Sequence, residues 1–297
     1  MDDMANMVKK AEAYLESAGK LTEEYLRGYI PNENEIPGTL HSAMRYALLV
    51  GGKRLRPALV RAAYEFFGGK QSESICLAMC ALEMLHTFSL IHDDLPCMDD
   101  DDFRRGKPST HKVYGEATAV LAGDALCIFA FELIARTGSA AVIEELAHSL
   151  GTKGMIGGQI IDIESEGKSV DLATVDYIHH HKTAALIEAS LVIGALLANA
   201  EREDLEHIRE FGRGIGLVFQ IVDDILDIES STEKLGKDVG SDVKNGKATY
   251  PAILGLEASK QKAMELYGKS ITHLEKLQGK NTETLRNIAA LIIERTH

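Results

Sequence analysis

The acidic stretch at residues 92–105 carries the side chains best suited to chemistry. Six aspartates fall at positions 93, 94 and 99–102, and Arg104 and Arg105 follow them directly. A run of like charges is usually a solvated surface, but here an apolar run at 77–90 leads into the charges, which places them at the end of a helix predicted to be buried. Carboxylates gathered there repel one another unless a cation neutralises them, and hard oxygen ligands suit Mg²⁺. The stretch predicts a magnesium site, with the arginines placed for phosphate oxygens.

A second acidic cluster lies near the end of a predicted helix at 203–229. Asp223 and Asp227 are four residues apart and share one helical face, and Asp224 lies three residues before Asp227. Like charges at that spacing weaken an isolated helix, and the apolar residues around them argue against simple solvation. Two such clusters, each ending an apolar helix, favour metal binding over a charged surface.

Basic residues occur in groups that could bind phosphate. A lone lysine or arginine is usually surface decoration, but arginine offers a planar fork to phosphate and lysine a point charge, so mixed groups suit two diphosphates. His86 lies two helical turns before Asp93 on the same face, where a buried core histidine is the alternative interpretation. The basic residues considered are Lys53, Arg54, Arg56, Arg104, Arg105, Lys182, Lys237 and Lys247.

The elements that must position these residues are predicted to be helices. Between Pro108 and Pro251 there is no proline, and apolar residues recur at intervals of three and four. We therefore predict an all-α protein, a single domain over residues 1–297 built from about ten or more helices. The expected helices after an N-terminal one at 4–29 include 58–67, 72–94, 117–136, 140–151, 155–164, 170–182, 183–200, 203–229, 248–259, 261–277 and 282–296. The polar segment 230–246, rich in Gly, Lys and Asp, is predicted to be a mobile flap.

Composition excludes several classes of protein. The net charge of −13 argues against non-specific nucleic-acid binding. The N-terminus lacks the basic and apolar regions of a signal peptide. The longest apolar stretch, 184–200, is interrupted by Glu188 and is short for a membrane span of ~20 residues. The four cysteines show no zinc-ligand spacing with histidines. Cys76 and Cys80 are one helical turn apart in an apolar segment, so we expect them to be buried thiols, and a reducing cytoplasm fits best.

At this point the residues match a known family. The chain resembles the all-α trans-prenyltransferases, and most closely the bacterial farnesyl diphosphate synthases. The paired DDxxxxD and DDxxD motifs are highly specific, and the segments occur in the expected order over most of the chain. The matching segments are GGKRLRP at 51–57, LHTFSLIHDDLPCMDDDDFRRGKPSTH at 85–111, LAGDAL at 121–126, GGQIIDI at 157–163, HKT at 181–183, FQIVDDILD at 219–227 and GKDVGSDVKNGKATYP at 236–251.

The resemblance implies a fold and a role for each matching residue. It implies a helical bundle around a central cavity and a homodimer, for which the helix at 117–136 could be the interface. The aspartates implied to bind Mg²⁺ are Asp93, Asp94, Asp99, Asp223, Asp224 and Asp227. The residues implied to contact the allylic diphosphate are Arg104, Lys182, Thr183, Gln220, Lys237 and Lys247, and those implied to bind isopentenyl diphosphate without metal are Lys53, Arg56, His86 and Arg105. The role of Arg54 stays open.

The implied reaction has a physical logic. Ionisation of an allylic C–O bond separates a diphosphate from a carbocation, and Mg²⁺ and cationic side chains stabilise the departing charge. The double bond of isopentenyl diphosphate attacks the cation, and the released diphosphate is a plausible base for the proton then lost. Lys182, Thr183 and Gln220 are the residues implied to stabilise the reacting groups. The flap at 230–246 would exclude water.

Phe88, five residues before Asp93, is the residue implied to set product length. An aromatic ring there resembles the members that make farnesyl diphosphate from dimethylallyl or geranyl diphosphate, whereas ordinary core packing is the alternative. A geranylgeranyl diphosphate synthase is the second candidate function.

Three other functions fit less of the chain. A terpene cyclase would not need the metal-free set of basic residues. A metal phosphohydrolase would leave the second aspartate cluster unused. Non-catalytic partner subunits of the family usually lose aspartates from the motifs, and this chain keeps both motifs.

Overall fold

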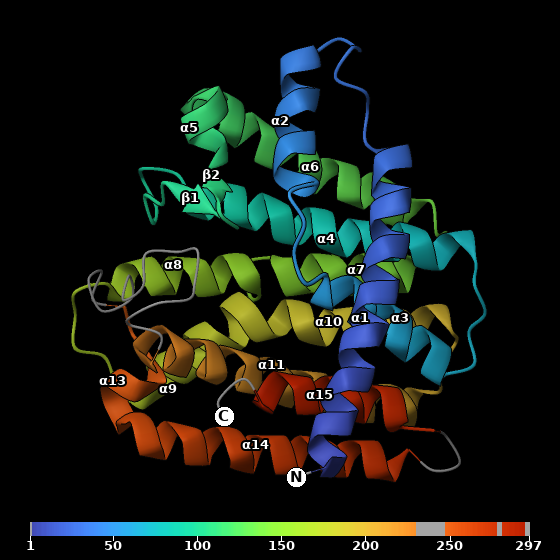
Figure 1. Cartoon of the computed structure of the whole chain (residues 1–297), viewed down its shortest axis with the longest axis vertical. Coiled ribbons are helices and arrows are strands. Elements are labelled where there is room, and N and C mark those ends of the chain that lie inside the picture. Colours follow the sequence, from blue (N-terminus) through green and yellow to red (C-terminus); the bar gives the residue numbers. More distant parts are fainter. Residues whose placement is uncertain (1, 230–246, 278–280, 295–297) are drawn as a thin grey trace. The chain divides into compact units, whose positions relative to one another are not determined.

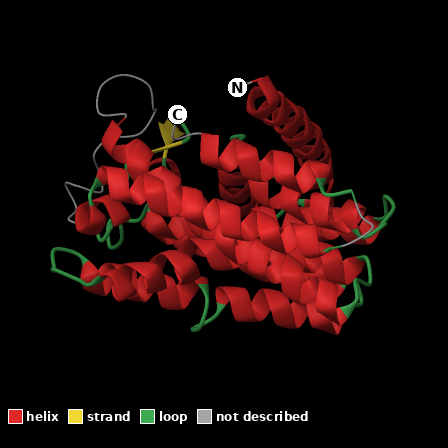
Figure 2. Cartoon of the chain, turned by 90° about the horizontal axis from the view of Figure 1, so that it is seen from below, coloured by secondary structure: helices red, strands yellow, loops and turns green. Residues whose placement is uncertain are grey.

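The computed structural model describes residues 2–229, 247–277 and 281–294. Helices account for most of the backbone that the structure describes, and the all-α prediction is confirmed (Figures 1 and 2). The chain divides into two compact units. The first unit contains Met1–Tyr14, Leu59–Lys70 and Glu144–His297, and the second contains Leu15–Ala58 and Gln71–Ile143. Three helices carry residues of both units: α1 (Asp2–Tyr29), α3 (Leu55–Phe66) and α7 (Ala140–Leu150).

The second unit is built around α4 (Glu73–Asp93), which lies beside α6 (Figure 1). Almost every apolar side chain of α4 is buried, and burying each leucine or isoleucine stabilises the fold by roughly 1.5–3 kcal/mol. Gly123 of α6 permits the close approach, because a Cβ there would lie 2.3 Å from His92 Nε2. The other elements of this unit are α2 (Gly38–Leu48), β1 (Phe103–Arg104), β2 (Lys107–Pro108), α5 (Thr110–Tyr114) and α6 (Glu116–Ala135).

The first unit is organised around the long amphipathic helix α11 (Arg202–Glu229), which packs against α10 and α14 (Figure 1). Its buried stripe includes Phe211, Ile215 and Ile225, which recur at helical spacing. The other helices of this unit are α8 (Met155–Ser165), α9 (Leu172–Ile178), a π-helical turn (His179–Ala184), α10 (Ala185–Leu197), α13 (Tyr250–Leu254), α14 (Leu256–Lys276) and α15 (Glu283–Glu294).

Two helices, α4 and α6, are long and apolar enough to cross a membrane by length and composition alone. Most of α4 is buried inside the protein, as in the core helix of a soluble protein, and two such helices are weak evidence for membrane insertion. The apolar stretch at 184–200 forms α10, which is buried as predicted.

Local structure differs from the sequence-based expectation at several places. The helices predicted at 248–259 and 261–277 are divided at Gly255 instead. After the acidic stretch, in a chain predicted to be all-α, a hairpin forms in which Phe103 pairs with Pro108 and Arg104 with Lys107. A short helix, α5, follows it. The residues expected as the junction between two α-helices, His179–Ala184, form the π-helical turn.

Candidate active site

The first aspartate motif is folded by the end of α4. Asp93 is the last residue of the helix, and its backbone carbonyl accepts a hydrogen bond of 2.8 Å from the Asp99 N–H. The intervening turn therefore returns the chain, so that Asp93 and Asp99 lie side by side although six residues separate them. Both side chains are half-buried. This pair is the part of the predicted metal site that the backbone of the second unit brings together.

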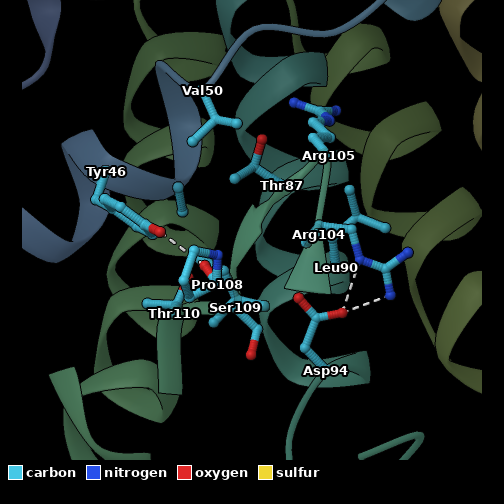
Figure 3. A pocket seen from close by; sticks show the side chains of 12 residues that line it. Tyr46, Val50, Thr87, Leu90, Asp94, Arg104, Arg105, Pro108, Ser109 and Thr110 are labelled. Atoms are coloured by element: carbon cyan, nitrogen blue, oxygen red, sulfur yellow. Dashed lines mark hydrogen bonds and ion pairs between the residues drawn. The ribbon is translucent and has the colours of Figure 1, made fainter. Parts of the chain in front are cut away.

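Asp94, between these two residues, is buried and engaged by an arginine. The Arg104 guanidinium donates to Asp94 Oδ1 from Nε at 2.7 Å and also from Nη2, as the dashed lines in Figure 3 show. Arg104 also binds Asp101 Oδ2 at 2.8 Å. Burial raises the pKa of Asp94 to about 6, against the opposing effect of Arg104. Asp94 therefore holds Arg104 in place, and its role as a metal ligand remains a prediction.

A small cavity lies next to this pair (Figure 3), with residues of α2, α4 and the hairpin around it. The centre of a water-sized molecule can occupy about 30 Å³ within it. Thr87, Asp94, Arg104 and Arg105 contribute polar side chains to its wall.

Two further aspartates of the acidic stretch lie at the surface. Asp100 and Asp102 are exposed and gather with His111, so that one potential ligand atom of each lies within 4.8 Å of the others. Asp102 also pairs with Lys112 at 2.6 Å. The exposure of Asp100 and Asp102, and the pairing of Asp102 with Lys112, agree with a solvated or supporting role for these two side chains.

The residues predicted to bind isopentenyl diphosphate all belong to the second unit. The pKa of His86 lies well below its usual range because of burial, with further effects from Arg56, Arg105, Arg104 and Arg54. His86 is therefore neutral at physiological pH. Arg54 and Arg105 meet at Glu83, which lies three residues before His86 on α4, so part of the basic set that is scattered in the sequence comes together here.

Arg105 is held against the loop at residues 51–54, here called the glycine loop, which contains Gly51 and Gly52. Its Nη1 donates to the Gly51 carbonyl, and its Nη2 lies 3.5 Å from Glu83 Oε1. A Cβ at Gly52, whose φ is +135°, would lie 2.8 Å from Arg105 Cζ. The backbone therefore favours glycine at position 52, and a side chain there would also displace the Arg105 guanidinium. Sequence reasoning missed Glu83, which appears as one polar residue in an apolar run.

The second aspartate motif lies on α11 in the first unit. Asp223 is exposed, whereas Asp224 is buried and accepts hydrogen bonds from His179 Nε2 at 2.9 Å, Gln220 Nε2 at 2.8 Å and the Tyr250 N–H at 3.1 Å. Gln220 Oε1 in turn accepts from Thr183 Oγ1 at 2.7 Å. Asp224 thus holds the predicted Thr183–Gln220 pair, and its predicted metal contact is not tested by these bonds.

The donor set of the two motifs suits a hard divalent cation. Asp227 Oδ2 is buried and has no hydrogen-bond partner among the described residues, an arrangement that costs free energy unless a cation or donor satisfies it. Exposed Asp223 lies on the same face of α11. Oxygen ligands on each motif fit Mg²⁺, the metal that the sequence predicts.

Lys182 lies in the π-helical turn, where its Nζ contacts Asp162 Oδ2 at 2.5 Å. Single π turns inside helices are often found at functional sites. Gly158 of α8 allows the turn to sit close, because a Cβ there would lie 2.3 Å from the Lys182 backbone nitrogen. Gly216 of α11 does the same beside Ala184, at 2.7 Å. Two glycines thus support the turn that carries Lys182 and Thr183.

Replacement of Gly158 by alanine is expected to displace this turn and lower turnover at least about tenfold, with a loss of stability of about 1–3 kcal/mol. The added methyl group meets backbone that cannot rotate away. Steady-state kinetics and thermal unfolding measure the two effects. Gly268→Ala on α14, where a Cβ meets nothing within 4 Å, is the matched control. Normal turnover in Gly158→Ala would contradict the supporting role of this glycine.

Phe88 lies on α4 and is only 8% exposed. Its ring meets the His92 ring edge-on, with 5.5 Å between centroids, and His92 Nε2 lies 3.0 Å from the Val120 carbonyl of α6. The ring is therefore fixed in place by its neighbours, although its role in product length stays a prediction. Of the two late lysines, Lys247 lies just before α13, and Lys237 lies outside the described residues.

Comparison with known proteins agrees with these features. The chain belongs to the polyprenyl synthetase family, whose model matches residues 37–284. It is therefore a prenyltransferase of the trans-prenyltransferase family.

Individual relatives carry two kinds of name. The chain is 45% identical to farnesyl diphosphate synthase of Bacillus subtilis, over 98% of this chain and all of that one. It is 50% identical to a chloroplastic geranylgeranyl pyrophosphate synthase of Capsicum annuum, over 87% of this chain and 72% of the relative.

Solved structures show the same fold. An FPP/GFPP synthase from Zymomonas mobilis is similar with a TM-score of 0.84 and 35% identity, over 96% of this chain and 99% of that chain. A geranyltransferase from Helicobacter pylori, solved with magnesium and isoprenyl diphosphate, has a TM-score of 0.80 and 32% identity, over 95% of this chain and 96% of that chain.

Proposed function

We propose that this protein is a Mg²⁺-dependent farnesyl diphosphate synthase that condenses isopentenyl diphosphate with dimethylallyl or geranyl diphosphate. The observation that carries the proposal is Phe88, a buried ring one turn before the first aspartate motif. A fixed aromatic ring there would stop a growing chain after fifteen carbons. The near full-length similarity to the Bacillus subtilis enzyme supports the same product.

The chain's own residues account for the steps of this reaction. We propose that Asp93, Asp99, Asp223 and Asp227, with Asp94 and Asp224 beside them, hold Mg²⁺. When bound, the metal would neutralise the diphosphate that leaves the allylic substrate. Arg104, Lys182, Lys237 and Lys247 would hold the same diphosphate, and Lys53, Arg56, His86 and Arg105 that of the acceptor.

Two oxygens are arranged to stabilise the carbocation. Because the Gln220 amide nitrogen is occupied by Asp224, the amide oxygen points toward Thr183, to whose hydroxyl it is bonded at 2.7 Å. Each oxygen keeps a lone pair beyond this bond. Fixed dipoles of this kind stabilise developing positive charge without reorganisation. The proton lost after condensation would pass to the released diphosphate.

Two features favour elongation over the alternatives. Arg56, His86 and Arg105 all belong to the second unit, and a terpene cyclase would not need such a metal-free set. Both aspartate motifs are complete, unlike those of non-catalytic partner subunits. A geranylgeranyl product is the second candidate, favoured by relatives such as the Capsicum annuum enzyme.

We also propose that the two units together form one polyprenyl synthetase domain over residues 1–297, since the family match crosses both. The protein would be a cytoplasmic homodimer. The α6 helix supports the dimer, because Leu121 is 59% and Ile128 70% exposed on it. Apolar side chains so exposed are typical of a surface that a partner covers.

The test of function is to incubate the protein with isopentenyl diphosphate, Mg²⁺ and each allylic starter in turn, and to size the products. Dimethylallyl and geranyl diphosphate are both expected to give farnesyl diphosphate, with no product when excess chelator is present. Mainly twenty-carbon product would select the second candidate. Absence of isopentenyl diphosphate consumption would refute elongation altogether.

A further inference from the structure

Glu83 is a carboxylate buried in the apolar helix α4, with its side chain only 1% exposed. A buried charge is stable only when it is paired and hydrogen-bonded. Glu83 Oε1 meets two guanidiniums: Arg54 Nη1 at 2.5 Å and Arg105 Nη2 at 3.5 Å. These partners are 29 and 22 residues away in the chain. One carboxylate oxygen therefore links α4 to two separate segments.

Arg54, the first partner, closes the glycine loop. Its side chain is 2% exposed, and its Nη2 donates to the Leu48 carbonyl at 2.8 Å and approaches Glu23 at 3.4 Å. Its backbone φ of +48° is in the left-handed region, which a non-glycine residue adopts only when its surroundings enforce it. Arg54 thus fixes the loop that carries Lys53 and Arg56, and this explains its place beside them.

Arg105, the second partner, comes from the hairpin that follows the first aspartate motif. Its guanidinium lies between Glu83 and the Gly51 carbonyl. A flexible arginine held at both sides of its fork has one orientation. Loss of Glu83 would remove the contact between the Arg105 guanidinium and α4. Arg54 would lose its contact with the same carboxylate oxygen.

Glu83 shares one negative charge between two arginines. Arg54 also has Glu23 nearby, at 3.4 Å, whereas the carboxylate that Arg105 contacts among the described residues is Glu83. Because the single charge is shared with Arg54, Glu83 orients Arg105 without fully neutralising it.

We propose that Glu83 is a positioning residue for the acceptor diphosphate: it sets the places of Arg105 and of the loop at 51–57, and it acts through them. This inference rests on the proposed binding of isopentenyl diphosphate by that group. The effect should be specific to the acceptor, because the groups proposed for the allylic diphosphate do not contact Glu83 among the described residues.

Glu83→Gln tests the proposal, since it keeps the shape of the side chain and removes its charge. The KM for isopentenyl diphosphate is expected to rise about tenfold or more, with kcat and the KM for geranyl diphosphate within about twofold. Titration calorimetry with isopentenyl diphosphate, without divalent metal, should show the same weakening. Glu23→Gln is the matched control, because Glu23 also contacts Arg54 but is 36% exposed. It should leave both constants unchanged.

The two possible roles of the charge predict opposite results. If Glu83 merely weakened the positive field, its neutralisation would tighten acceptor binding, and unchanged or tighter binding would overturn the proposal. Glu83→Asp keeps the charge and shortens its reach, and it serves if the glutamine variant does not fold. Acceptor affinity should fall in this variant too. Wild-type affinity in a folded Glu83→Asp would also overturn the positioning role.

Arg105→Gln separates this inference from the proposed function. If this variant binds isopentenyl diphosphate normally, the acceptor site itself is misassigned. If it binds weakly while Glu83→Gln binds normally, only the role of Glu83 fails. If Glu83 acts through Arg105, the fold-loss of acceptor affinity in the double variant should be smaller than the product of the two single fold-losses.

Discussion

Asp93→Ala and Asp223→Ala are each expected to lower turnover about a thousandfold, the equivalent of about 4 kcal/mol of transition-state stabilisation. Asp93 ends α4 beside Asp99, and Asp223 is exposed on α11. Neither substitution removes packing from the core, and each relieves repulsion within a cluster of like charges. Helix content by circular dichroism should therefore stay unchanged.

Steady-state kinetics over a range of Mg²⁺ concentrations measure this effect, and higher metal concentration should restore part of the lost rate. Asp102→Asn is the matched control. It belongs to the same acidic stretch, is exposed and pairs with Lys112, so its turnover should stay within about twofold of the parent. Full activity of either alanine variant would refute the mechanism in which both clusters hold metal.

Phe88→Ala is expected to change the main product from farnesyl to geranylgeranyl diphosphate. The ring is buried and held edge-on against His92, so its removal opens space beneath the aspartate motif that the neighbours cannot close. The same substitution should lower the free energy of unfolding by about 3–5 kcal/mol, as for other buried rings. Chromatography of radio-labelled products and thermal unfolding measure the two effects.

Phe88→Tyr is the control, because it keeps the ring and should keep a fifteen-carbon product. If the alanine variant is folded and still stops at fifteen carbons, the ring is core packing and does not set product length. A twenty-carbon product from the parent protein itself would instead favour the geranylgeranyl assignment.

Most of the helices could be predicted from the sequence because apolar residues recur at helical spacing and burial follows that spacing. The hairpin at Phe103–Pro108 could not, since strands of two residues are too short to show alternation. The π-helical turn depends on the close approach of Gly158 and Gly216, which is a tertiary effect. Local pattern contains no signal for it.

The candidate site was predictable where chemistry shows in residue type, and less so where it depends on pairing. Clustered aspartates and arginines stand out in the chain. The hydrogen bonds of Arg104 to Asp94 and of Gln220 to Asp224 could not be predicted, because the sequence does not distinguish one aspartate of a motif from the next. Glu83 was missed for a related reason: its partners are distant in sequence, and one charge within an apolar helix gives no hint of them.

The hydrogen bonds of Asp224 constrain how this protein can evolve. Its two oxygens join His179, Gln220 and Tyr250, which belong to three different helical elements. A substitution at His179 or Gln220 removes a side-chain donor from the buried carboxylate of Asp224, so the effect of a change at one depends on the residue at the other, whereas the Tyr250 donor is a backbone N–H. Sequence drift at these sites should therefore be strongly epistatic. Compatible combinations would be inherited together, and a residue transplanted singly from a relative would be poorly tolerated.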